Sequence, residues 1–120
     1  DVVPPVTAWH GEPELAWGVG LIRSHASVGE GIDKALLERA PLRFSVRNGG
    51  ESMRLRENGP RRPLKDLLRE AGVPPWQRGN LPILYKENEV VWVPTVGIAS
   101  QYRCKPAKDG VLIEFDGVTW

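Results

Sequence analysis

Residues 60–82, Pro60-Arg-Arg-Pro-Leu-Lys-Asp-Leu-Leu-Arg-Glu-Ala-Gly-Val-Pro-Pro-Trp-Gln-Arg-Gly-Asn-Leu-Pro82, decide how the rest of this chain is organised. Apolar residues recur at i, i+3, i+4 and i+7, a spacing typical of one stripe of a short amphipathic helix: Leu64, Leu67, Leu68 and Ala71. Pro63 fits the first helical turn, where a missing N–H costs nothing, and Gly72 fits the left-handed position after the last turn. We therefore expect a helix that packs through its leucines and presents cations on its other face.

Length and composition limit what the rest of the chain can be. The 120 residues, 41% of them hydrophobic, suit one domain over residues 1–120. No apolar run approaches the ~20 residues of a membrane helix, and no signal peptide is present. Cys104 is the only cysteine, which favours a reducing compartment, so we expect a cytoplasmic protein without a membrane partner. The chain begins without Met, which favours a fragment.

The charge is unevenly distributed along the chain. Its sixteen Lys/Arg and fifteen Asp/Glu leave a net charge of +1. Between Arg43 and Arg78, however, nine cations stand against four acids, which leaves seven cations and eleven acids elsewhere. A basic middle between acidic ends is typical of an anion-binding face. A merely solvated face would have the same composition, so both interpretations stay open.

Short runs of apolar residues, and runs in which apolar and polar residues alternate, predict a chain dominated by strands. Pro4 and Pro5 exclude helix from the first residues, which we expect to be extended. Asp33 can cap a short helix through Ala40. Strands are expected at residues 6–10, 15–25, 42–47, 52–56, 81–86, 89–93, 98–104 and 111–115. The fold class that follows is α+β, a mostly antiparallel sheet or open barrel packed on one main amphipathic helix.

A hairpin of residues 42–47 and 52–56, turning at Asn48-Gly49-Gly50-Glu51, gives the best argument for function from the residues alone. Its alternation would place four arginines on one outer face: Arg43, Arg47, Arg54 and Arg56. Like charges on neighbouring strands repel each other unless an anion lies over them.

No catalytic constellation is evident. His10 and His25 are isolated, and neither has a Cys or carboxylate at ligand or triad spacing. Cys104 is expected to be a structural thiol. Glu51 is a candidate acid or base, but we favour its pairing with a neighbouring Arg. Trp76 is open to stacking on a base or ribose; we favour its burial as a core residue, because Trp is commonly buried.

Four runs in the second half carry a family signature, listed here by residue number: 42–51 (LRFSVRNGGE), 64–78 (LKDLLREAGVPPWQR), 81–85 (LPILY) and 91–94 (VWVP), followed by Gly97. Together they resemble the C-terminal domain of bacterial tRNA(Ile)-lysidine synthetase. The resemblance covers residues 41–120, and residues 1–40 form a strand-rich lead-in with weaker motifs.

The resemblance implies a function. The family consists of ATP-dependent ligases that attach lysine to the wobble cytidine of an isoleucine tRNA, forming lysidine. ATP and Mg²⁺ belong to a separate N-terminal domain with a Ser-Gly-Gly-x-Asp-Ser loop that this chain lacks, so this part of the enzyme is expected to be non-catalytic, without cofactor or metal. Its implied partner is tRNA, chiefly the acceptor stem, and not DNA. A homodimer through the parent enzyme is also possible.

Carried onto this chain, the resemblance implicates Arg47, Gly50 and Glu51, then Lys65, Trp76 and Arg78. Arg78 is open to a second interpretation, as a buried donor that holds its own loop. The candidate tRNA-binding residues are Arg47, Arg54, Arg61, Arg62, Lys65, Arg69, Trp76 and Arg78. An RNA duplex suits such cations because it is recognised through its backbone and shape.

Two alternatives belong to other classes of protein. One is a structural or oligomerisation domain without direct RNA contact, whose cations face solvent and which self-associates through a strand edge. The other is a small stand-alone enzyme using Glu51 and a nearby Arg. The absence of a nucleophile or metal-ligand cluster argues against the enzyme.

Overall fold

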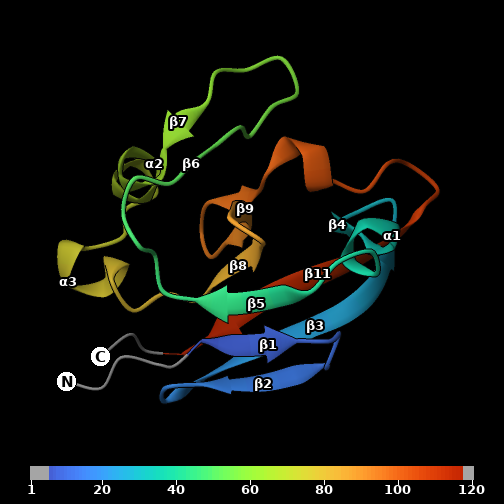
Figure 1. The fold of residues 1–120 in the computed structure, drawn as a ribbon, viewed down its shortest axis with the longest axis horizontal. Coiled ribbons are helices and arrows are strands. Elements are labelled where there is room, and N and C mark those ends of the chain that lie inside the picture. The colour runs from blue at the N-terminus through green and yellow to red at the C-terminus, as the bar shows by residue number, and fades with distance from the viewer. Residues whose placement is uncertain (1–5, 118–120) are drawn as a thin grey trace.

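Strands form two antiparallel sheets and a small ribbon in a computed structural model that describes residues 6–117 (Figure 1). The five-stranded sheet has the order β1 (Thr7–Trp9), β5 (Leu42–Ser45), β8 (Ile83–Lys86), β9 (Glu89–Val93) and β10 (Gly97–Ile98). The four-stranded sheet has the order β2 (Glu14–Trp17), β3 (Gly20–Val28), β11 (Asp109–Asp116) and β4 (Ile32–Asp33), and the ribbon pairs β6 (Ser52–Met53) with β7 (Arg62–Pro63). This confirms the predicted α+β class. The extended start expected at residues 1–5 lies outside the described residues.

The helices are short: α1 (Lys34–Leu37), α2 (Leu64–Glu70), α3 (Pro75–Arg78) and the 3₁₀ turn η1 (Ser100–Tyr102). The predicted main helix is α2, whose three leucines are buried. Ala71 is exposed beyond its end, and Gly72 has the expected left-handed backbone, with φ +81°. The Asp33 carboxylate caps α1 by accepting the Ala35 N–H at 3.0 Å, but that helix ends at Leu37 and does not reach Ala40. None of the helices in the described part of the chain is long and apolar enough to cross a membrane.

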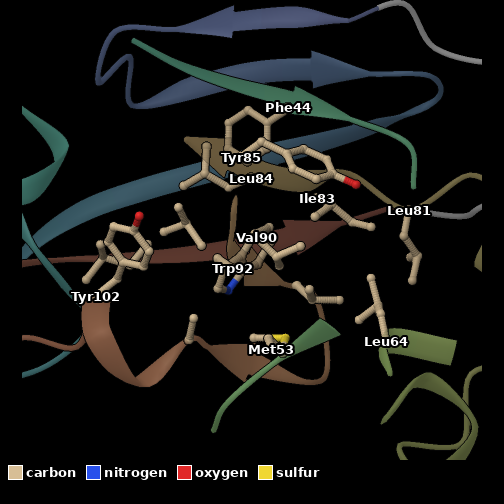
Figure 2. Packing of buried hydrophobic residues seen from close by; sticks show 14 of the residues in the cluster. Phe44, Met53, Leu64, Leu81, Ile83, Leu84, Tyr85, Val90, Trp92 and Tyr102 are labelled. Atoms are coloured by element: carbon tan, nitrogen blue, oxygen red, sulfur yellow. The ribbon is translucent and has the colours of Figure 1, made fainter. Parts of the chain in front are cut away.

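One hydrophobic cluster takes side chains from both large sheets and from α2. Phe44 lies at its centre, with ring centroids 5.6 Å from Trp9 and 6.3 Å from Trp92. Figure 2 shows Phe44 on one side of this cluster and Met53 and Leu64 on the other. The ribbon and α2 are therefore anchored through buried side chains while their polar sides stay outside.

The strand predicted over residues 15–25 is in fact two strands. β2 and β3 form a hairpin in which Trp17 pairs with Gly20, with Gly18 and Val19 as the turn. Gly18 has φ +58°, a conformation that suits the first position of a two-residue hairpin turn. Gly20 marks a close approach of two backbone segments, because a Cβ there would lie 2.9 Å from the Gly117 Cα.

The predicted hairpin of residues 42–47 and 52–56 is wrong. β5 lies between β1 and β8, so both of its edges are occupied. β6 instead pairs with β7, and the Arg54 carbonyl accepts the Ser100 N–H at 2.8 Å. The four arginines therefore do not share the outer face of a hairpin.

The strand predicted over residues 98–104 is also wrong. Only Gly97 and Ile98 pair with β9, and the chain then turns into η1. The Tyr102 N–H donates to the Ala99 carbonyl at 2.9 Å, and both residues are buried. The turn places the Tyr102 side chain in the hydrophobic cluster.

Candidate nucleic-acid interface

The loop that leaves β5, residues 47–51, is held in shape by one of its own side chains. The Glu51 carboxylate accepts the N–H groups of Asn48 and Gly49, at 2.5 and 2.9 Å. The Tyr85 hydroxyl donates to the same carboxylate at 2.7 Å, and the Glu51 carbonyl accepts the Leu64 N–H at 2.8 Å. The loop is thus tied both to β8 and to the first residue of α2.

These contacts determine the charge state and the role of Glu51. Burial works to raise the pKa of its carboxyl, but hydrogen bonds from the Asn48 amide, the Tyr85 hydroxyl and the Gly49 amide outweigh burial, and the pKa lies below its usual value. Burial and the adjacent carboxylate raise the pKa of Tyr85 in turn. The predicted pairing of Glu51 with an Arg is wrong for the described residues: the carboxylate acts as a clamp for the backbone.

A hollow of about 540 Å³ opens between this loop, the start of α2 and the end of α3. We call it the Arg47–Lys65 hollow. Its lining comprises Arg47, Asn48, Gly49, Gly50, Glu51, Ser52, Pro63, Leu64, Lys65 and Gly79. The Lys65 side chain is exposed and Arg47 is half-buried. Within residues 6–117 neither cation has a hydrogen bond or an ion pair with another side chain.

Three other predicted cations already have partners. Arg62 donates two hydrogen bonds to the Glu70 carboxylate, one of them 2.8 Å long, and this holds the pKa of Glu70 below its usual value. Arg69 lies 3.5 Å from Asp66. Arg61 donates through Nε and Nη2 to the hydroxyl and carbonyl of Ser52, at 3.1 and 2.9 Å. An anion would have to compete with these partners.

Of the four arginines first assigned to the hairpin face, the three other than Arg47 do not line the hollow. Arg54 and Arg56 are exposed in the long connection between β6 and β7 (Figure 1). Arg43 lies over the Tyr85 ring, 4.8 Å from its centroid, and donates to the Glu87 carbonyl. None of these three lines the Arg47–Lys65 hollow.

Trp76 and Arg78 belong to α3, beside the hollow. The prediction that Trp76 is a core residue is wrong, because 73% of its surface is exposed. Arg78 donates from Nε to the Val73 carbonyl at 2.9 Å, which is the loop-holding role that we had left open for it. Gly79, which follows α3, forms part of the hollow's wall.

A second hollow, of about 830 Å³, lies between β1, β3 and α1. His10 and His25, which appeared isolated in the sequence, both line it, together with Lys34, Glu38 and Arg39. No group of three His, Cys, Asp or Glu that could hold a metal occurs among residues 6–117. This hollow depends on β1 pairing with β5, a contact between distant residues that no local pattern signals.

The fold and the Arg47–Lys65 hollow define a small antiparallel α+β module with a cationic recess at the start of its main helix. A family model described as the TilS substrate C-terminal domain matches residues 42–115, and the chain belongs to that family. This confirms the resemblance seen in the sequence.

Three of the related proteins, each named tRNA(Ile)-lysidine synthase, illustrate the similarity. That of Aromatoleum aromaticum is 37% identical over 106 residues, which are 88% of this chain and 25% of the relative. That of Chromobacterium violaceum is 43% identical over 106 residues, or 88% of this chain and 20% of the relative. That of Ralstonia nicotianae is 45% identical over 82 residues, or 68% of this chain and 17% of the relative. The chain thus spans a quarter or less of their length.

A solved structure described as the crystal structure of a TILS C-terminal domain has the same fold. It superposes with a TM-score of 0.64, covering 99% of this chain and 95% of the solved one, at 21% identity. The arrangement of strands and helices described above is therefore that of the family's C-terminal domain.

Proposed function

We propose that this chain is the tRNA-binding module of a ligase that attaches lysine to the wobble cytidine of an isoleucine tRNA. In this proposal the module grips the acceptor stem, while ATP and Mg²⁺ bind to a catalytic domain elsewhere in the longer protein. Membership of the family, the name of its relatives and the share of their length that the chain spans support it. The proposed setting is the bacterial cytoplasm.

The observation that carries the proposal is the Arg47–Lys65 hollow. Two cations that are 18 positions apart in the sequence line one recess, and neither is neutralised by a described carboxylate. The clamp formed by Glu51 fixes the backbone beside Arg47, so this part of the loop need not be ordered when a ligand arrives. Cations held in this way suit phosphates of an RNA duplex, which presents its backbone and shape to proteins.

The remaining candidates are given unequal roles in this proposal. Arg54 is exposed without a described side-chain partner and is assigned a phosphate contact at the edge of the surface. Arg61, Arg62 and Arg69 would exchange existing partners for phosphates, so they are expected to contribute less than Arg47 and Lys65. Arg78 is assigned to holding α3, with its outer nitrogens toward the RNA.

The experiment is to measure the dissociation constant for the isoleucine tRNA, its isolated acceptor stem and an unrelated elongator tRNA. Arg47→Ala and Lys65→Ala are compared with Lys108→Ala, an exposed lysine of the turn before β11. Loss of one phosphate contact is expected to weaken binding about sixfold at 0.1 M salt, from a salt slope of roughly 0.7–0.9 per contact. Lys108→Ala should change little.

A different pattern would favour another class of protein. Equal losses of tRNA affinity in all three variants, or no binding of the unaltered chain at low salt, would contradict the proposal. Sedimentation with and without tRNA then tests the structural alternative, which predicts self-association and no RNA complex.

A further inference from the structure

Trp76 is an aromatic side chain that the fold leaves outside its core. Among the described residues the exposed large hydrophobics are Val6, Val19, Val28 and Trp76, and only the last is aromatic. Trp9, Trp17 and Trp92 are at most 6% exposed, so the fold can bury tryptophan where it needs to. Trp76 therefore contributes little to the core and has a large apolar surface available for a ligand.

The short helix that carries Trp76 is held by two prolines and two hydrogen bonds. Pro74 and Pro75 fix the backbone before it. The Gln77 N–H donates to the Pro74 carbonyl at 2.9 Å, and Arg78 Nε donates to the Val73 carbonyl at 2.9 Å. A ligand that stacks on this indole therefore pays little to order the backbone beneath it.

The backbone that carries the indole lies close to the Arg47–Lys65 hollow. Gly79 lines that hollow and follows Trp76 by three positions, so their Cα atoms are at most about 11 Å apart. Consecutive nucleotides of one strand rise by about 3.4 Å along the axis of B-DNA, and the rise in an RNA duplex is of the same order. A strand whose phosphates occupy the hollow would bring a base to Trp76 within a few nucleotides.

We infer that Trp76 stacks on an open base face at the end of the bound RNA helix, on the terminal pair or on the first unpaired nucleotide. This inference rests on the proposed function. Inside a duplex both faces of every base are covered by neighbouring pairs, and only an end or an unpaired nucleotide offers a free face to an aromatic side chain. The phosphates in the hollow and the stacked base at Trp76 together fix where the stem ends relative to the module. The module then recognises where the stem ends, in addition to the charge of the stem's phosphates.

The test uses this chain with three RNAs of one stem sequence: a stem with an open end, the same stem with both ends closed by a non-nucleotide aromatic linker that covers the terminal pair, and the open stem with one unpaired 3′ nucleotide. Trp76→Ala is compared with Trp76→Phe, which keeps an aromatic ring. Val19→Ala, which shortens another exposed apolar side chain, is the control. Circular dichroism verifies that each variant is folded.

Trp76→Ala should weaken binding to both stems with an open end by about 5- to 150-fold, the loss of one stacked base. Trp76→Phe should restore most of the affinity, and Val19→Ala should match the unaltered chain. On the closed stem, Trp76→Ala and the unaltered chain should bind equally.

Three outcomes would overturn the inference. Trp76→Ala could weaken binding to open and closed stems alike, or leave the affinity for all three RNAs unchanged. It could also alter only self-association in sedimentation, which would make the indole a protein contact. Failure of the unaltered chain to bind any RNA at low salt would overturn the proposed function itself, and the inference with it.

Discussion

Replacing Glu51 with Gln tests whether one carboxylate holds the loop that carries Arg47. The carboxylate accepts two backbone N–H groups and the Tyr85 hydroxyl. A glutamine offers a single acceptor oxygen and turns an NH₂ group toward donors. Because hydrogen bonds to a charged group contribute about 1.5–3 kcal/mol, we expect Glu51→Gln to lower the free energy of unfolding by roughly that amount, or about 6–12 °C in Tm for a chain of this size.

The direction of the Glu51 pKa shift determines how the effect of Glu51→Gln on stability changes with pH. The folded state lowers the pKa of Glu51 below the usual 4.5. The stability that it contributes is therefore fully present above that value and is lost as the pH falls through the lower folded pKa. The difference between the unaltered chain and Glu51→Gln should be largest near pH 7 and shrink progressively in acid below about pH 4.5.

Urea unfolding at a series of pH values measures both effects. Glu57→Gln is the matched control, because Glu57 is exposed and has no hydrogen bond or ion pair among the described residues. Surface substitutions alone change the free energy of unfolding by up to about 0.5 kcal/mol. A smaller decrease than that for Glu51→Gln at pH 7 would therefore refute the clamp. A decrease that is the same at pH 3 as at pH 7 would also refute it.

Three further changes follow from the fold and the charge pattern. Leu68→Ala should cost about 2–5 kcal/mol in urea unfolding, because Leu68 is fully buried in the cluster; a cost below 1 kcal/mol would show that α2 is not anchored as described. Thr95→Gly should raise Tm, because Thr95 has φ +66° and relief of a left-handed β-branched residue, about 1–2 kcal/mol, exceeds the entropy cost of glycine; a lower Tm would contradict it. Arg62→Ala should reduce RNA affinity less than Arg47→Ala does, because Arg62 is already paired with Glu70, and the reverse order in a binding titration would contradict this ranking.

The parts of the fold that could be predicted from the sequence are those fixed by neighbouring residues. The stripe of Leu64, Leu67 and Leu68 and the position of Gly72 predicted α2 because helix signals lie within one or two turns. The α+β class followed in the same way from short alternating runs. The pairing between distant residues was not predicted: β5 pairs with β1, which precedes it, and with β8, about forty residues later, rather than with the run that directly follows it.

The sequence identified residues of the candidate site but not how they lie relative to one another. Arg47 and Lys65 were named from the sequence, but their sharing of one hollow depends on how the loop after β5 meets α2. The clamp by Glu51 involves backbone N–H groups and Tyr85, and no sequence pattern records such contacts. The interpretation of Trp76 as buried relied on an average tendency of tryptophan, whereas α3 leaves this side chain exposed.

The central claim is that the Arg47–Lys65 hollow contacts phosphates, and the salt dependence of binding tests it most directly. The dissociation constant for the isolated acceptor stem is measured over a range of salt concentrations for the unaltered chain and for a chain carrying both Arg47→Ala and Lys65→Ala. We predict that the double change lowers the log–log slope by about 1.4–1.8, as expected for the loss of two contacts. An unchanged slope, whatever the affinity, would contradict the account.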